Sequence, residues 1–220
     1  MEQIILNIAT MMPGFLLGIV CHEAAHAYVA MRFGDNTAAY QGRLSLNPMV
    51  HYDPIGTVVF PLIGAMIGGV MFGWAKPVPV DSRYFKNIKR GIFWVSFAGP
   101  LANIALAILS ALLLAIIIVW IPQDFTYYQP FLLMARYSVM INTILAVFNL
   151  LPFPPLDGSK MAATFMDYNT ARKFEGLQQY SFLFLIVLLL TGALSYIIQP
   201  ALIAGDFLIG LFTYLLSSLR

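Results

Sequence analysis

The sequence has little charge. Only 10% of its 220 residues are Asp, Glu, Lys or Arg, whereas an ordinary soluble protein has about 25%. The net charge of +2 is too small to suggest a nucleic-acid partner, and no mixed basic and aromatic patch occurs. The single cysteine, Cys21, excludes a disulfide within the chain. The first residues lack a basic stretch, so we do not expect a cleaved signal peptide.

Apolar residues dominate instead. They make up 60% of the chain, and the mean hydropathy is +0.81. This composition predicts an all-α polytopic membrane protein, because a helix satisfies its own backbone hydrogen bonds in lipid. The length indicates one membrane-embedded domain over residues 1–220, with the lipid bilayer as its first partner.

The apolar runs predict about five transmembrane helices. Three core helices are expected at 4–33, 91–121 and 130–151, and a C-terminal helical hairpin at 180–217 that turns at Gln199-Pro200. Pro13-Gly14 predicts a kink or a frayed turn in the first helix. Residues 38–74 are rich in turn residues and glycine, which indicates a re-entrant or β-hairpin segment at the membrane edge, with a short strand at GRLSL (42–46).

The basic residues predict an orientation. If residues 58–74 do not cross the membrane, 11 of the 12 lysines and arginines fall on one side and only Arg136 lies toward the other. Basic loops stay in the cytoplasm. We therefore expect a multi-pass protein of the cell membrane with its N-terminus outside and its C-terminus in the cytoplasm.

One polar motif interrupts the first apolar helix, at Cys21-His22-Glu23-Ala24-Ala25-His26. On a helix, His22 and His26 share one face and can bind one Zn²⁺, and Glu23 can act as a general base toward water. A lone buried histidine is usually structural. Two histidines and a glutamate at this spacing, within a helix where ionisable groups are costly, favour a metal site instead. Cys21 points away from the metal-facing side and is expected to pack in the core.

A catalytic zinc usually has three protein ligands and one open position. Asp157 is the strongest candidate for the third, because it follows the helix break at Pro152-Phe153-Pro154-Pro155. The alternative is a solvated loop aspartate in a glycine turn.

HEAAH in an early transmembrane helix, together with NLLPFPPLDG at Asn149–Gly158, resembles the site-2 protease family of intramembrane zinc metalloproteases. The segment Gly99-Pro100-Leu101-Ala102-Asn103 is similar to the family's central-span motif. The stretches GRLSLNP, HYDPIGT and WAKPVPV resemble its small prokaryotic branch, which lacks a PDZ or CBS domain.

The resemblance implies that one Zn²⁺ per chain is held by His22, His26 and Asp157, with Glu23 as the general base. It also implies that Asn149 and Asn103 bind substrate backbone or stabilise an oxyanion. For Asn103, the alternative is an interhelical hydrogen bond. His51 is a further candidate, as an accessory ligand or substrate contact; a solvated loop histidine is the alternative.

These observations predict hydrolysis of peptide bonds within or near the transmembrane helix of a single-span substrate, as in regulated intramembrane proteolysis. A substrate strand pairing with GRLSL is one way to present an open backbone. Another membrane metallohydrolase, or a non-enzymatic metal-binding or transport protein, remains as an alternative. The absence of an internal repeat argues against transport.

Overall fold

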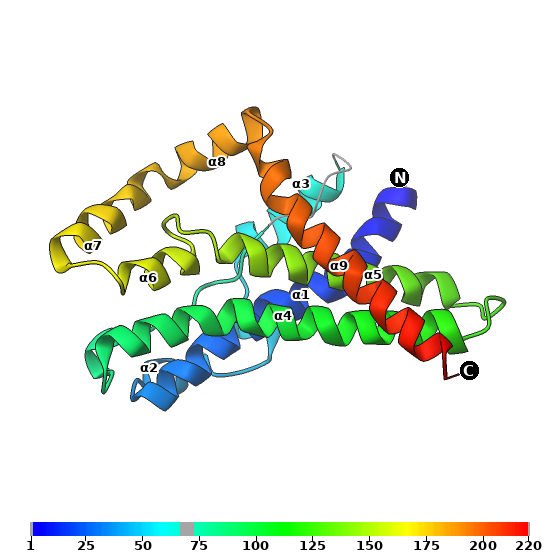
Figure 1. Ribbon diagram of the computed structural model, residues 1–220, viewed down its shortest axis with the longest axis horizontal. Coiled ribbons are helices and arrows are strands. Elements are labelled where there is room, and N and C mark those ends of the chain that lie inside the picture. Colours follow the sequence, from blue (N-terminus) through cyan, green and yellow to red (C-terminus); the bar gives the residue numbers. More distant parts are fainter. Residues whose placement is uncertain (1, 67–72, 220) are drawn as a thin grey trace.

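The computed structural model describes residues 2–66 and 73–219, which are largely helical and contain no β-strand. Figure 1 shows the helices in chain order. The α-helices are α1 Glu2–Phe33, α2 Thr37–Tyr40, α3 Phe60–Met66, α4 Ile88–Trp120, α5 Tyr128–Asn149, α6 Asp157–Ala163, α7 Tyr168–Glu175, α8 Ser181–Leu190 and α9 Ala193–Ser217. The remaining turns of helix are η1 Pro48–Val50, η2 Pro54–Val59, η3 Ser82–Tyr84 and η4 Gly176–Tyr180. The predicted all-α polytopic class is confirmed.

Four of the described helices are long and apolar enough to cross a membrane: α1, α4, α5 and α9. The core helices predicted at 4–33, 91–121 and 130–151 correspond to α1, α4 and α5. The prediction of about five spans therefore overcounted by one among the described residues. Figure 1 shows both chain ends toward the end of the molecule that carries the α4–α5 connection. The orientation with the N-terminus outside and the C-terminus in the cytoplasm stays a prediction.

The extra span was expected in the C-terminal hairpin. The run beginning at Tyr180 forms α8, whose 10 residues are too short to cross the ~30 Å hydrocarbon core. The helix breaks at Gly192, whose φ of 71° lies in the left-handed region that glycine adopts freely. Pro200, where the turn was predicted, lies inside the continuous helix α9. Pro13 likewise lies within the unbroken helix α1.

The strand predicted at GRLSL is not present, and residues 42–46 form a turn and bends. Arg43 points inward and is 9% exposed, and Gly42 has a φ of 66°. Residues 42–46 therefore form no extended edge with which another strand could pair. Further on, η2 and α3 form a short helical run from Pro54 to Met66. The part of the predicted re-entrant segment at 67–72 lies outside the described residues.

Helix α1 contacts α5 closely because two small residues share one face. A Cβ on Gly14 would lie 2.7 Å from the Ser138 Cα, and one on Gly18 would lie 2.8 Å from the Asn142 Oδ1. Such small-xxx-small spacing lets transmembrane helices approach to backbone contact. His22 and His26 continue the same i, i+4 row toward the C-terminus of α1.

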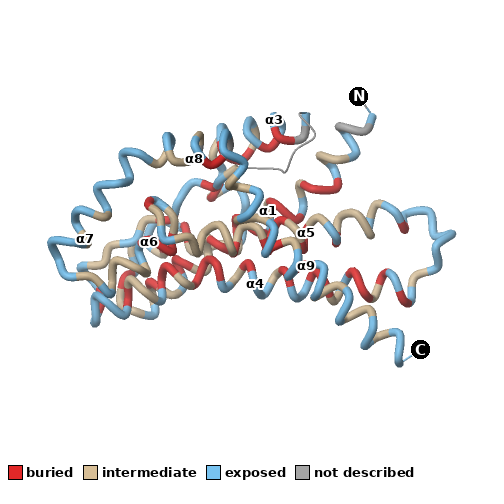
Figure 2. The backbone as a smooth tube through the Cα atoms, turned by 45° about the horizontal axis from the view of Figure 1, so that its top comes forward, coloured by how far each residue is buried: buried red, intermediate tan, exposed pale blue. Residues whose placement is uncertain are grey.

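Helix α4 is central and packs against α1, α5, α9 and α6. It begins where the Asn87 side chain accepts a hydrogen bond from the Arg90 amide. It ends at Trp120, just before Pro122, which cannot continue the hydrogen-bonded ladder. Figure 2 shows buried residues concentrated where α1, α4 and α5 meet, whereas α7 is mainly exposed.

Candidate metal centre

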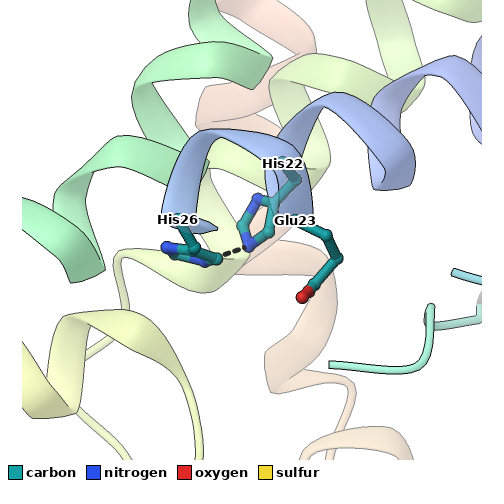
Figure 3. Close-up of side chains that lie close together, drawn as sticks. All are labelled: His22, Glu23 and His26. Carbon is teal, nitrogen blue, oxygen red and sulfur yellow. Dashed lines mark hydrogen bonds between the residues drawn. The ribbon is translucent and has the colours of Figure 1, made fainter. Parts of the chain in front are cut away.

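The two histidines of α1 face each other across one turn of the helix. Their Nε2 atoms are 3.0 Å apart, and the residues are 8% and 7% exposed. Figure 3 shows both imidazoles turned toward a common point, with Glu23 reaching past them from the same turn. About 10 Å of helix separates His26 from the end of α1 at Phe33. The pair therefore lies toward the end of the span that carries Arg32.

Asp157 joins the pair from a segment distant in sequence. Its Oδ2 lies 3.1 Å from the Nε2 of His22 and 3.2 Å from the Nε2 of His26. Asp157 is the first residue of α6, placed there after α5 ends at Asn149 and the prolines turn the chain back. The structure thus brings the three predicted ligands together, and Asp157 is 5% exposed.

These three atoms fit a zinc ion. Atoms about 2.0 Å from one tetrahedral centre are about 3.3 Å apart, close to the three separations found here. Two imidazole nitrogens and one carboxylate oxygen are also a ligand set that zinc accepts in catalytic sites. Brought this close, such atoms repel one another unless a cation or proton lies among them.

The charge on Asp157 follows from its neighbours. Burial raises the pKa of this carboxyl, but hydrogen bonds from His22 and His26 and the positive charge of Lys160 outweigh it, so the pKa lies well below its usual range. Lys160 Nζ is 3.3 Å from Asp157 Oδ1. Asp157 is therefore held in the anionic form that a metal ligand requires.

The second ring nitrogen of each histidine has its own partner. His26 Nδ1 is 2.6 Å from the Val95 carbonyl oxygen, and His22 Nδ1 is 2.7 Å from Asn103 Oδ1. Both partners only accept hydrogen bonds, so each Nδ1 carries the proton and donates. Each Nε2 is then the atom that faces Asp157: it donates to the carboxylate while it carries a proton, and it binds a metal once that proton is lost.

Helix α4 supplies these contacts from one row of positions: Val95, Gly99 and Asn103 at four-residue intervals. Between the two acceptors, a Cβ on Gly99 would lie 2.5 Å from His26 Nε2 and 2.6 Å from His22 Nε2. Only glycine leaves room for the ligand atoms there. Gly99 stands in a motif of the sequence, but the motif does not indicate this contact.

Glu23 lies beside the three candidate ligands and is not one of them. It forms a group with His22 and His26 whose candidate ligand atoms all lie within 4.8 Å of one another. Its Oε2 accepts a hydrogen bond of 2.7 Å from the Val78 amide. The carboxylate of the predicted base is therefore held by the extended chain that follows Trp74.

The other predicted residues lie elsewhere. Asn103 is fully buried, its amide nitrogen donates to the Gly18 carbonyl and to Asn142, and its oxygen supports His22, so its predicted role on substrate stays a prediction. Asn149 is half-buried and donates to the Leu145 carbonyl of its own helix. His51 is 1% exposed and bonds the Ser45 carbonyl through Nε2, within its own loop. A role of Asn149 or His51 on substrate stays a prediction.

Comparison with known proteins bears on the family. Peptidase family M50 matches residues 119–191. A protein of Bacillus subtilis (strain 168) named "Putative zinc metalloprotease YwhC" is 35% identical over 219 residues, which cover 97% of each chain. This chain belongs to peptidase family M50. M50 is the site-2 protease family, so the resemblance predicted from the two motifs is confirmed.

Other M50 relatives are more distant. A Mycolicibacterium smegmatis protein named "Putative zinc metalloprotease Rip2" is 31% identical over 182 residues, 83% of this chain and 67% of Rip2. A protein of Methanocaldococcus jannaschii, MJ0611, is 27% identical over 147 residues, 66% of this chain and 64% of its own. No solved structure matches the chain. Family and fold together make this a multi-pass membrane metalloprotease of the site-2 type.

Proposed function

We propose that this protein is an intramembrane zinc metalloendopeptidase, which hydrolyses peptide bonds within or near transmembrane helices of membrane-protein substrates. The observation that carries the proposal is the meeting of Nε2 of His22, Nε2 of His26 and Oδ2 of Asp157 within 3.2 Å of one another, beside Glu23. Three such ligands hold one Zn²⁺ per chain and leave its fourth position open.

The residues divide the chemistry among them. A bound Zn²⁺ supplies a Lewis acid that polarises a peptide carbonyl and makes water more acidic. Glu23 takes a proton from the attacking water and passes it to the departing amine. Asp157 would balance part of the positive charge of the metal, and His22 and His26 would bind it through Nε2, because each Nδ1 donates to a fixed oxygen.

The substrate we propose is a single-span membrane protein, cut as in regulated intramembrane proteolysis. The candidate centre lies between a spanning helix and α6, close to the end of α1. A peptide bond must leave its helix to react, because helical amides are tied to carbonyls four residues away. We therefore expect cleavage where the substrate helix frays, toward the membrane edge.

The test compares the wild type with Glu23→Gln, both purified in detergent and incubated with a synthetic single-span peptide. General-base catalysis contributes about 10²–10⁴-fold, so the variant should be slower by that factor. Its zinc content should equal that of the wild type, since Glu23 is not one of the three ligands. Mass spectrometry of both products gives the cleaved bond.

Each other outcome has a definite meaning. Equal cleavage by the two proteins removes Glu23 as the base. Failure of the wild type to cut the peptide, with release of a lipid amine or a lipidated fragment from membranes, replaces peptide hydrolysis by the other membrane metallohydrolase activity. A zinc-loaded protein with no hydrolytic product supports a metal-binding or transport role instead.

A further inference from the structure

The centre is connected to α5 by a chain of buried polar side chains that crosses three helices. Asn103 Nδ2 is 2.9 Å from Asn142 Oδ1, and Asn142 Nδ2 is 2.9 Å from the Ser138 carbonyl. Beyond this, the hydroxyls of Ser138 and Ser110 are 2.8 Å apart. Asn103 and Asn142 are 0% exposed, so these two amides have no contact with lipid or water.

Such a chain is costly in a membrane helix unless every group is paired. Packing alone does not require it, because two leucine-like residues would fill the same space between apolar helices. At one end the chain meets a side chain that can bind metal, His22, and at the other it ends on the Ser138 carbonyl and the hydroxyls of Ser138 and Ser110. This points to a role at the metal centre and not merely in holding the helices together.

Main-chain carbonyls only accept hydrogen bonds, so they fix which group donates and which accepts at each link of this series of polar side chains. Because the Ser138 carbonyl accepts from Asn142, the nitrogen of that amide faces Ser138 and its oxygen faces Asn103. Because Asn142 Oδ1 and the Gly18 carbonyl both accept from Asn103, the oxygen of Asn103 must face His22. His22 Nδ1 must then donate, and its Nε2 lone pair is left for the metal.

We propose that Asn142 is a positioning residue, which orients the Asn103 amide and thereby fixes His22 in its metal-binding tautomer. The inference rests on the proposed zinc site and extends it to a residue on α5 that touches no ligand. Outer partners of metal-bound histidines typically contribute 10–100-fold in metal affinity. We expect Asn142 to contribute near the lower end, since Asn103 keeps its second acceptor at Gly18.

The test measures zinc affinity of the full-length protein in detergent by competition with chelators, for the wild type and Asn142→Leu. The matched control is Thr143→Val, because Thr143 is the neighbouring buried residue and its hydroxyl bonds only carbonyls of its own helix, those of Val139 and Met140. We expect zinc to bind about tenfold more weakly to Asn142→Leu and unchanged to Thr143→Val.

A double-mutant cycle separates orientation from packing. In Asn103→Asp both side-chain oxygens accept, so His22 Nδ1 donates whichever way the group is turned. Adding Asn142→Leu to Asn103→Asp should therefore weaken zinc binding by less than about twofold. A tenfold loss in this background as well would mean that Asn142 acts through packing, and the inference would fall.

Two measurements keep the outcomes distinct. Thermal unfolding of the zinc-free proteins shows whether Asn142→Leu only destabilises the fold; if it aggregates, Asn142→Ser replaces it, since a serine hydroxyl can bond its own helix but cannot reach Asn103. Wild-type affinity for zinc in Asn142→Leu or Asn142→Ser overturns the inference alone. A wild type that binds no zinc overturns the proposed centre itself.

Discussion

At the scale of a residue, the closest constraint on the centre is a missing side chain. Gly99 presents its Cα side to both imidazoles, and any Cβ there would lie within 2.6 Å of both Nε2 atoms. Contacts this short cannot be relieved by a small shift, because His22 and His26 are held from behind by Asn103 and the Val95 carbonyl. Glycine at this position is therefore a condition for metal binding.

We expect Gly99→Ala to reduce the zinc content from about one per chain to nearly none, because the methyl group occupies the space where the ligands converge. Metal analysis of the purified protein measures it. Gly210→Ala is the control, since a Cβ at Gly210 meets nothing within 4 Å. A fully loaded Gly99→Ala protein would show that α4 can move away from α1 at little cost.

The sequence indicated the ligands better than their supports. His22, Glu23, His26 and Asp157 could be proposed because spacing and the cost of charge in a membrane helix mark them. The contacts of Gly99 and Asn103 depend on how α1 is aligned along α4, which no local pattern records. For Asn142 the sequence shows an amide within an apolar helix, but it does not indicate which residue that amide bonds.

At the scale of an element, the extended chain from Trp74 to Asp81 is attached to the protein by several hydrogen bonds, among them one from the Lys76 amide to the His51 carbonyl. Arg43 donates to the Lys76 and Pro77 carbonyls at 2.6 and 3.2 Å. The Val78 amide donates to Glu23, and the Asp81 amide donates to buried Asp35 at 2.7 Å. The position of the proposed base is thus coupled to a buried arginine that lies outside the motif.

We expect Arg43→Met to slow peptide cleavage about ten- to a hundredfold and to leave zinc content unchanged, because a base displaced by about 1 Å loses that much. Rates with the single-span peptide and metal analysis on the same sample measure it. The control is Arg83→Met: Arg83 is exposed and pairs only with nearby Asp81. Loss of zinc in Arg43→Met would show that Arg43 also supports the metal ligands, and the expectation would be wrong.

Two elements predicted from the sequence were wrong at this scale: the helix boundary at Pro200 and the strand at 42–46. A proline was expected to end the C-terminal helix at 200, yet membrane helices accommodate proline when neighbouring groups satisfy the freed carbonyl. Gly192 ended it instead, through a left-handed φ. The strand at 42–46 failed for a different reason: alternation favours a strand only where another strand can pair with it.

At the scale of the molecule, four crossings and the distribution of basic residues propose an orientation. The loops beside the metal centre carry most lysines and arginines, so we propose that this end lies in the cytoplasm and both termini outside. In the Cys21→Ala background, Asp124→Cys and Ser218→Cys should react with an impermeant thiol reagent in intact cells. Lys86→Cys should react only after permeabilisation. Protection of Ser218→Cys together with Lys86→Cys would restore the five-span arrangement.

His22 and Asp157 are separated by 135 positions. During synthesis, the first helix enters the membrane with both imidazoles and the glutamate in place, while the third ligand has yet to be translated. Until α4, α5 and the start of α6 have emerged and packed, the newborn polypeptide has only two of its three ligands. A centre that requires Asp157 therefore cannot form before α4, α5 and the start of α6 have been made and packed.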